Sequence, residues 1–148
     1  MTNSEQPDIS PQRRGAIGVI CDTFGRLLVI ERSQTVRAPG RYCFPGGGIE
    51  HGESEEQAVV RELDEELSII VSPVRRLWTS ETESGVLLLW WLVTLQTGQQ
   101  PRPNPEEVAR YFWMRPPQIL RQRATLKSNR EFLMALAAGR FSLDADNQ

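Results

Sequence analysis

Short runs in which apolar and polar residues alternate recur along this chain, and a period of two is typical of β-strands with one buried face. Segments rich in glycine, proline and small polar residues interrupt them and favour turns. One such segment, Thr97–Pro105, holds three prolines and one glycine and is therefore expected to be a loop. The pattern predicts strands near Arg14–Asp22, Arg26–Glu31, Val74–Glu81, Val86–Gln96 and Ala109–Met114.

A helical period governs the middle of the chain. Residues 55–67 contain no glycine or proline, and Ser54 before them is a residue type that caps helix N-termini. At about 100° per residue, apolar side chains gather on one stripe of this helix and glutamates on the neighbouring one. The apolar stripe comprises Val59, Val60, Leu63 and Leu67, and the acidic stripe comprises Glu62, Glu65 and Glu66, with Glu55 two turns earlier. The helix is expected to pack on a core along one edge and to present carboxylates along the other.

A second helix is predicted near the C-terminus. Ser128 and Glu131 have the spacing of a capping box, and the helix is expected to run to about Ala138 and to stop at Gly139. Mixed strands with helices on either side suggest the α/β class, as an α/β/α sandwich with a mixed β-sheet.

The acidic stripe has two explanations. Most glutamate-rich helix faces are simply solvated, and like charges at i and i+4 then repel by roughly 0.2–0.5 kcal/mol. A hard divalent cation would remove this repulsion, and a set of carboxylate oxygens suits Mg²⁺ or Mn²⁺. The chain has one histidine and two cysteines, so a zinc site is disfavoured.

The spacing of residues 47–69 decides between these explanations. The segment reads GGIEHGESEEQAVVRELDEELSI and matches Gly-x5-Glu-x7-Arg-Glu-U-x-Glu-Glu-x-Gly-U, where U is an aliphatic residue. This pattern resembles the Nudix box. Ser68 is the one departure, because the family has glycine there. That glycine resembles a left-handed helix C-cap, so serine is expected to cost some stability and to leave the chemistry intact.

The resemblance covers roughly residues 14 to 138 and looks closest to the MutT type, the hydrolases that cleanse oxidised guanine nucleotides. It is carried by PGGGIE at 45–50, EQAVVREL at 56–63 and LWWLV at 89–93. It implies the Nudix-type α/β/α sandwich, a small-molecule nucleotide as partner and Mg²⁺ or Mn²⁺ as cofactor. The implied reaction is hydrolysis of a nucleoside diphosphate linked to a moiety X, giving pyrophosphate when the substrate is a triphosphate.

The resemblance also assigns roles to glutamates. Glu53 becomes a ligand or a residue that orients the attacking water. The general base maps to Glu62, with Glu53 and the region of Glu107 as alternatives. The implied metal ligands are the carbonyl of Gly47 and the carboxylates of Glu62, Glu65, Glu66 and Glu107. For Glu107 the alternative is a solvated loop residue, with Glu106 taking the metal role.

Other positions are assigned to catalysis or to the substrate. Arg61 is expected to position a neighbouring glutamate through a bidentate ion pair. Gly46 and Gly48 would let the chain pass close to metal and phosphate, although MutT-type enzymes carry lysine at Gly48. Arg32 ends a strand where that type has a phosphate-contacting arginine, and its alternative is a plain surface residue. Asn129 could read a purine edge, and its alternative is a helix residue without a ligand.

Length and charge fit a single enzyme domain. We expect a disordered polar tail at 1–13, one Nudix hydrolase domain at 14–140 and a C-terminal tail at 141–148. A net charge of −2 argues against nucleic-acid polymers as partners, and the ten-residue apolar run 86–95 is too short to span a membrane. Two cysteines without a disulfide framework favour a cytoplasmic location. The oligomeric state stays open, a homodimer included.

Two rival functions remain at this point. One is hydrolysis of a different Nudix substrate, such as ADP-ribose, a dinucleotide polyphosphate or a nucleotide sugar, since loops set the substrate in this family. The other is a non-catalytic module that binds a nucleotide. Modules of that kind tend to have lost box carboxylates, and every box carboxylate is present here.

Overall fold

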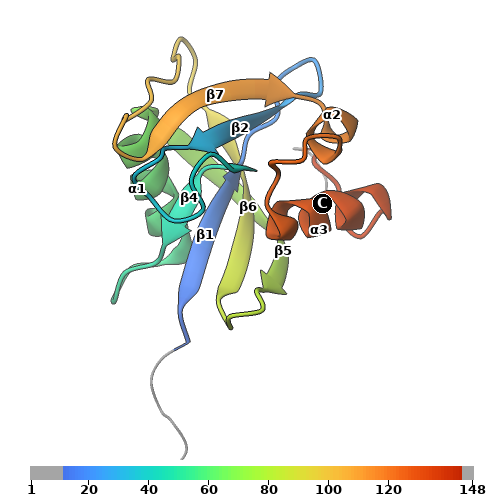
Figure 1. Ribbon diagram of the computed structural model, residues 1–148, viewed down its shortest axis with the longest axis horizontal. Coiled ribbons are helices and arrows are strands. Elements are labelled where there is room, and N and C mark those ends of the chain that lie inside the picture. The colour runs from blue at the N-terminus through green and yellow to red at the C-terminus, as the bar shows by residue number, and fades with distance from the viewer. Residues whose placement is uncertain (1–11, 145–148) are drawn as a thin grey trace, which may run out of the picture.

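The computed structural model describes residues 12–144 (Figure 1). The predicted N-terminal tail therefore lies almost wholly outside the described residues. Seven strands and three helices follow one another as β1 Arg14–Val19, β2 Leu27–Arg32, β3 Tyr42–Cys43, β4 Gly46–Gly48, α1 Glu55–Leu67, β5 Val71–Glu81, β6 Leu87–Leu95, β7 Val108–Met114, α2 Pro116–Leu120 and α3 Lys127–Ala137. Among residues 12–144, no helix has the length and apolar character needed to cross a membrane.

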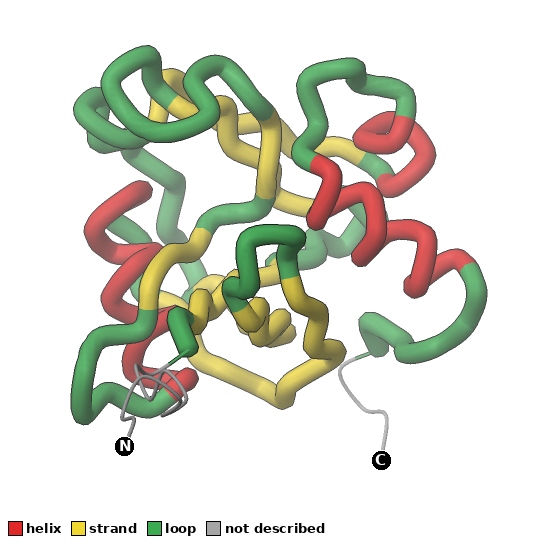
Figure 2. The backbone as a smooth tube through the Cα atoms, turned by 60° about the horizontal axis from the view of Figure 1, so that its bottom comes forward, coloured by secondary structure: helices red, strands yellow, loops and turns green. Residues whose placement is uncertain are grey.

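The strands form two sheets. The larger has the order β4-β1-β6-β5, with β1 parallel to β6 and the other neighbours antiparallel. The smaller has the order β3-β2-β7 and is antiparallel throughout. Helix α1 lies on one side of the strands, and α2 and α3 lie on the other (Figures 1 and 2). The prediction of an α/β/α sandwich with a mixed β-sheet is confirmed.

Each helical layer closes its own apolar core. On the side of α1, the predicted stripe residues Val59, Leu63 and Leu67 are fully buried. On the side of α3, the ring of Phe132 stacks on Trp90 with a centroid distance of 4.7 Å and meets Phe44 edge-on at 5.4 Å. Burying these large rings contributes on the order of 2 kcal/mol each through the hydrophobic effect. The two cores hold both helical layers rigidly against the strands.

Helix α1 begins and ends as predicted. Ser54 is its N-cap, and the Ser54 hydroxyl and the Gln57 side chain form a reciprocal capping box. Ser68 is the C-cap and adopts the left-handed conformation at φ 53°, ψ 41°. A side chain in that conformation costs roughly 1 kcal/mol relative to glycine. The helix therefore ends where the motif requires it, at a small cost in stability.

Two elements were missed by the pattern. Strand β4 consists of three glycines, which carry no side-chain period, and it forms because its backbone pairs with β1. Helix α2 follows Arg115, and the consecutive prolines at 116 and 117 were a usable start signal. Strand β5 also begins earlier than predicted, at Val71, and includes Pro73. Proline is tolerated there because β5 is an edge strand.

The predicted capping box of the last helix is wrong. Helix α3 begins at Lys127 with Leu126 as its N-cap, and no side chain caps it. The backbone of the preceding segment is bound to β3, since Tyr42 N–H donates to Ala124 O and Leu126 N–H donates to Tyr42 O. The helix starts as soon as the chain leaves this pairing. The end near Gly139 is as predicted, with Gly139 at φ 77°.

The described ends of the chain contact the domain. Gln12 donates a side-chain hydrogen bond to Gly85 O, and Arg13 O accepts from Leu87 N–H. At the other end, Phe141 packs against the rings of Trp78 and Phe132. Residues just outside 14–140 thus contact β5, β6 and the turn between them.

Candidate active site

Three carboxylates converge beside strand β4. Glu62 and Glu66 lie one turn apart on α1, and Glu107 lies immediately before β7. One oxygen of each residue lies within 4.8 Å of the others. Glu62 and Glu66 are only 9% and 5% exposed. Ionised groups at this separation repel by roughly 3 kcal/mol per pair at an effective dielectric constant of 20, so the cluster is suited to a cation.

The glycines of β4 form the opposite wall. Gly46 N–H donates to Glu66 Oε1 at 2.9 Å, which fixes that carboxylate against the sheet. A Cβ atom on Gly46 would lie 2.3 Å from Ala16 O, and one on Gly47 would lie 2.5 Å from the Glu62 carboxylate. A side chain at Gly46 would therefore collide with the backbone of β1, and one at Gly47 would displace the Glu62 carboxylate. The backbone approaches the glutamates closely only because these residues are glycine.

Burial raises the pKa of two of these carboxylates. For Glu66 burial is the largest cause, Gly46 N–H opposes it, and the charges of Glu62 and Glu107 add to it, giving a pKa of about 8. The pKa of Glu62 is also raised, mainly by burial, against the hydrogen bond and charge of Arg61. Without a cation, ionising these carboxylates therefore costs free energy. Such a cost is typical of a site that binds a cation.

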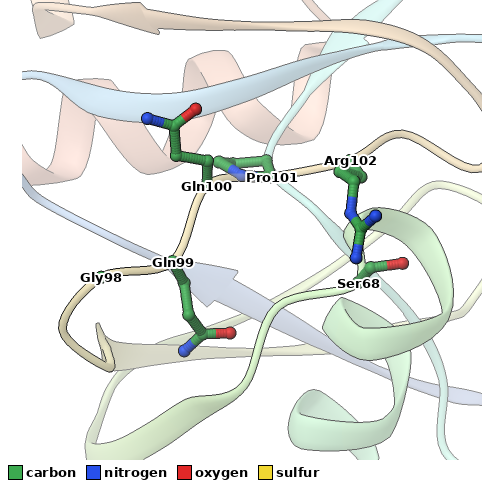
Figure 3. Close-up of a pocket in the computed structure, with 6 residues that line it drawn as sticks. All are labelled: Ser68, Gly98, Gln99, Gln100, Pro101 and Arg102. Atoms are coloured by element: carbon green, nitrogen blue, oxygen red, sulfur yellow. The ribbon is translucent and has the colours of Figure 1, made fainter.

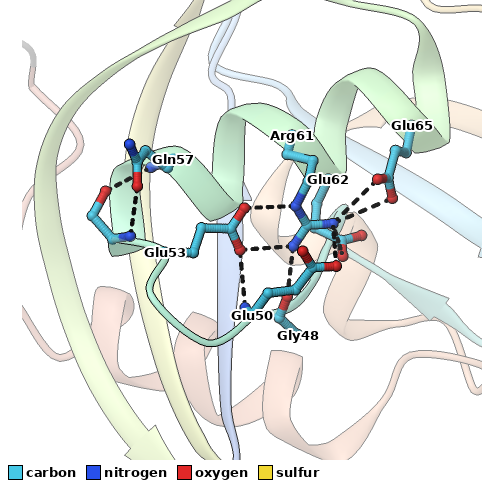
Figure 4. Close-up of polar contacts among 8 residues, drawn as sticks. Gly48, Glu50, Glu53, Gln57, Arg61, Glu62 and Glu65 are labelled. Atoms are coloured by element: carbon cyan, nitrogen blue, oxygen red, sulfur yellow. Dashed lines mark hydrogen bonds and ion pairs between the residues drawn. The ribbon is translucent and has the colours of Figure 1, made fainter.

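Arg61 connects the loop before α1 to the helix itself (Figure 4). Its Nε and Nη2 donate to Glu53 Oε2 and Oε1 at 2.6 and 2.9 Å, as a bidentate pair. Nη1 donates to Glu62 at 3.0 Å and to Glu65 at 3.2 Å, and Nη2 donates to Gly48 O at 2.9 Å. One guanidinium therefore holds glutamates from two segments and the end of β4 in a fixed arrangement.

Glu53 is bound on both oxygens. Besides the Arg61 pair, Glu53 Oε1 accepts from Glu50 N–H at 2.9 Å. The hydrogen bond from Arg61 is the main cause that lowers the pKa of Glu53 to about 2. Glu65 is half exposed at 48% of its side chain and faces Arg61. These two residues lie around the buried cluster.

Arg32 lies at the end of β2, beside the cluster. Its Nε donates to Arg37 O at 2.6 Å, in the loop that follows. Its positive charge lowers the pKa of Cys43 and of Glu66, whereas burial raises both. A positive charge therefore lies near the carboxylates, at the end of the central strand of the smaller sheet.

Asn129 lies in the first turn of α3 and is 4% exposed. Its Oδ1 accepts from Phe44 N–H at 2.9 Å, and its Nδ2 donates to Ser128 Oγ at 3.2 Å. This ties α3 to the segment that enters β4. The structure thus brings Glu53, Arg61, Glu65, the β4 glycines and Arg32 around the cluster, and it links Asn129 to that group through Phe44.

Glu55 does not join the acidic stripe, contrary to the helical-wheel expectation. Its carboxylate accepts from Arg76 at 2.9 and 2.7 Å and from the Trp91 indole at 2.8 Å. Strands β5 and β6 offer these donors beside the first turn of α1, so tertiary contacts override the period. Sequence reasoning also missed Asn104, which binds Glu107 at 3.2 Å. Its place between two prolines was a turn signal, although not a signal for a site.

A separate pocket of about 520 Å³ lies at the C-terminal end of α1 (Figure 3). It is lined by Ser68, Gly98, Gln99, Gln100, Pro101 and Arg102. None of the clustered carboxylates lines it. The candidate active site is therefore the carboxylate cluster, because charge and burial mark it, and not this pocket.

The chain is a hydrolase of the class that acts on phosphoric anhydride bonds, as its family match shows. A model of the NUDIX domain matches residues 11–136, and the chain belongs to that family. Family members generally use a divalent metal, and the cluster offers ligands for one.

Several relatives match part of the chain. The chain is 34% identical over 87 residues to an 8-oxo-dGTP diphosphatase of Escherichia coli (strain K12), covering 57% of this chain and 67% of that protein. It is 42% identical over 57 residues to an 8-oxo-dGTP diphosphatase of Proteus vulgaris, covering 38% of this chain and about half, 51%, of that protein. It is also 34% identical over 89 residues to an RNA pyrophosphohydrolase of Blochmanniella floridana, covering 57% of this chain and 54% of that protein.

Solved structures share the fold over most of their length. A MutT protein from Methanosarcina mazei Go1 has a TM-score of 0.72 at 20% identity, with 90% of this chain and 99% of that chain covered. A MutT NUDIX hydrolase from Burkholderia pseudomallei has a TM-score of 0.69 at 23% identity, with coverages of 84% and 98%. At these identities the likeness concerns the fold alone.

Proposed function

We propose that this chain hydrolyses purine nucleoside triphosphates, oxidised guanine nucleotides among them, between the α and β phosphates. The products are a nucleoside monophosphate and pyrophosphate. The observation that carries the proposal is the convergence of Glu62, Glu66 and Glu107 beside glycine strand β4. The names of two relatives, both 8-oxo-dGTP diphosphatases, support the substrate class.

The residues present fit Mg²⁺ or Mn²⁺. Buried carboxylates with raised pKa values, all offering oxygen, match the ligand preference of these hard cations. We assign the ligands to Glu62, Glu66 and Glu107, with Glu65 and the carbonyl of Gly47 as further ligands. A bound cation would offset the charge of the phosphates and lower the pKa of a water molecule.

Glu62 is our candidate for the general base. Its Oε1 is bound to Arg61, whereas its Oε2 has no such partner among the described residues. Its raised pKa, caused mainly by burial, makes it a stronger base than an ordinary carboxylate. Glu53 is less suited, because both of its oxygens accept hydrogen bonds and its pKa of about 2 makes it a weak base. Glu53 and Arg61 therefore act by holding Glu62 and Glu65 in position.

Arg32, the glycines and Asn129 complete the proposed substrate site. Arg32 supplies positive charge for the phosphates, and Gly46 and Gly48 keep the wall free of side chains. Asn129 contributes base recognition through its amide nitrogen, which has one hydrogen besides the one donated to Ser128. Its Oδ1 is engaged by Phe44 N–H, so the contact to the base is a donated one.

The test is a substrate panel measured with Mg²⁺ and with EDTA. The panel holds dGTP, 8-oxo-dGTP, dATP, pyrimidine triphosphates, ADP-ribose and an RNA with a 5′-triphosphate. The readout is kcat/KM from pyrophosphate or phosphate release, and from AMP formation for ADP-ribose. The RNA is included because a relative 34% identical over 89 residues is an RNA pyrophosphohydrolase. We expect a purine triphosphate to give the highest value. A higher value for ADP-ribose or for RNA would contradict the proposed substrate class.

Asn129→Ala tests base recognition within the same panel. A bidentate amide contact discriminates between bases by about 1–3 kcal/mol in DNA readout, and a single donated bond by less. We therefore expect the variant to flatten the base preference by several-fold. Equal preferences in the two proteins would remove Asn129 from base recognition.

A further inference from the structure

The three clustered carboxylates come from two separate parts of the chain. Glu62 and Glu66 share one turn of α1, so the helix fixes their spacing. Glu107 comes from the end of the long loop that joins β6 to β7. Its carbonyl accepts from Ser33 N–H at 3.0 Å, and contacts between this loop and α1 set its place relative to the other two carboxylates. Asn104 provides two such contacts, one from its side chain and one from its backbone.

The backbone of Asn104 bridges the two parts. Its N–H donates to Glu66 O at 2.9 Å, near the C-terminal end of α1. Its carbonyl accepts from the N–H groups of Glu107 and Val108 at 2.9 and 2.8 Å. Asn104 thus begins a tight turn that leads into the first residue of β7. Its N–H anchors this turn to Glu66 on α1.

The side chain of Asn104 adds a direct contact to the cluster. Its Nδ2 donates to Glu107 Oε2 at 3.2 Å and to Glu65 O at 3.4 Å, and its Oδ1 accepts from Glu106 N–H at 3.1 Å. The two N–H groups and the carbonyl of the amide are all used. The amide therefore connects the Glu107 carboxylate to a carbonyl of α1.

We propose that Asn104 is a positioning residue that orients the Glu107 carboxylate toward Glu62 and Glu66. This inference rests on the proposed metal role of the cluster and adds a residue that acts through Glu107. Serine is too short to reach Glu107, and alanine lacks both donor and acceptor. Aspartate keeps an acceptor for Glu106 N–H but offers no donor and adds negative charge. An amide at this length satisfies every contact.

The test measures Mn²⁺ binding by electron paramagnetic resonance of the free ion, without substrate. The variants are Asn104→Ala, Glu107→Gln and the double variant. Outer residues that orient metal ligands typically change metal affinity by about 10- to 100-fold. We expect Asn104→Ala to raise the Kd for Mn²⁺ by about tenfold. In the Glu107→Gln background the same substitution should change the Kd less than about twofold, because its effect passes through Glu107.

Gln99→Ala is the matched control. Gln99 anchors the same loop, since its side chain donates to Ile70 O at 2.8 Å and accepts from Ile70 N–H at 2.7 Å, but it does not touch Glu107. This variant should lower the melting temperature and leave the Kd for Mn²⁺ unchanged. Asn104→Ser keeps an acceptor near Glu106 N–H and serves as a second variant if Asn104→Ala fails to fold. It should weaken Mn²⁺ binding as Asn104→Ala does.

The outcomes separate the two proposals. Additive effects in the double variant, or a Kd for Asn104→Ala equal to that of the wild type, would overturn the role of Asn104. An equal loss of affinity in Gln99→Ala would also overturn it, because loop anchoring would then explain the effect. A wild-type protein that binds Mn²⁺ no more tightly than Glu66→Gln would instead remove the metal site, and with it the proposed function.

Discussion

Gly47 and Glu62 are packed so closely that a Cβ atom on the glycine would lie 2.5 Å from the carboxylate of the glutamate. Gly48, the next residue of β4, has no atom within 4 Å of the same ideal position. Adjacent glycines therefore face different environments. One allows the sheet to approach the cluster, and the other opens toward free space.

Gly47→Ala should therefore displace the Glu62 carboxylate and weaken the cation site. We expect Mn²⁺ affinity to fall at least about tenfold, a loss similar to that of other residues that orient ligands. Gly48→Ala is the control, and its Mn²⁺ affinity should stay within about twofold of the wild type. Both are measured by Mn²⁺ titration, with circular dichroism to check the fold. Equal affinities in the two variants would contradict the close-packing argument.

Removing one carboxylate charge should abolish most of the activity. Glu66→Gln and Glu65→Gln keep the side-chain shape, and each should lower kcat by at least about a hundredfold, as expected for loss of a group that stabilises developing charge. The fold should survive, because Glu66 is a buried acid with a raised pKa and a neutral amide is accommodated there. The measurement is Mg²⁺-dependent turnover beside the melting temperature. Near-normal turnover in Glu66→Gln would remove it from the ligand set.

Ser68→Gly should stabilise the protein. Ser68 sits at φ 53°, where glycine has no Cβ penalty, although glycine also gains conformational entropy in the unfolded chain. The net gain is expected to be about 0.5–1 kcal/mol in the free energy of unfolding, measured by urea denaturation. Ser68→Ala keeps the strain and should show no such gain. Because Ser68 holds no carboxylate, kcat should remain unchanged in both variants.

Gly48→Lys should strengthen binding of triphosphates. The position is exposed, and the space around an ideal Cβ atom is empty. An added ammonium group near the proposed phosphate site should lower KM for a nucleoside triphosphate several-fold at low salt, with a smaller effect at high salt because of screening. Gly48→Gln is the matched neutral variant. A similar fall in KM for both would show that charge is not the cause.

The Glu53–Arg61 pair should make stability depend on pH in the acid range. Arg61 lowers the pKa of Glu53 from its usual 4.5 to about 2, so the unfolded state binds the proton more readily than the folded state. The pair therefore stabilises the fold above about pH 4.5, and this contribution is lost as the pH falls toward 2. Melting curves of the wild type and Glu53→Gln in EDTA should differ most near pH 6 and converge toward pH 2. A constant difference would contradict the ionic origin.

The sequence by itself determined the parts that depend on neighbouring residues. Helix α1 was predicted with its N-cap at Ser54, its left-handed end at Ser68 and its buried stripe, because propensity, capping and a period of 3.6 act within a few residues. The spacing of the box likewise indicated the family, which the match over residues 11–136 confirmed.

Only the tertiary structure decided which groups meet across the chain. Glu55 pairs with Arg76 and Trp91 instead of the acidic stripe, although it shares the helical period of Glu62. Asn104 meets the backbone carbonyls of Glu65 and Glu66 because the loop folds back onto the end of α1. The start of α3 at Lys127 is likewise set by backbone pairing with β3 rather than by a cap. Such contacts join residues tens of positions apart, and their energies depend on distance and burial, which no local pattern of residues encodes.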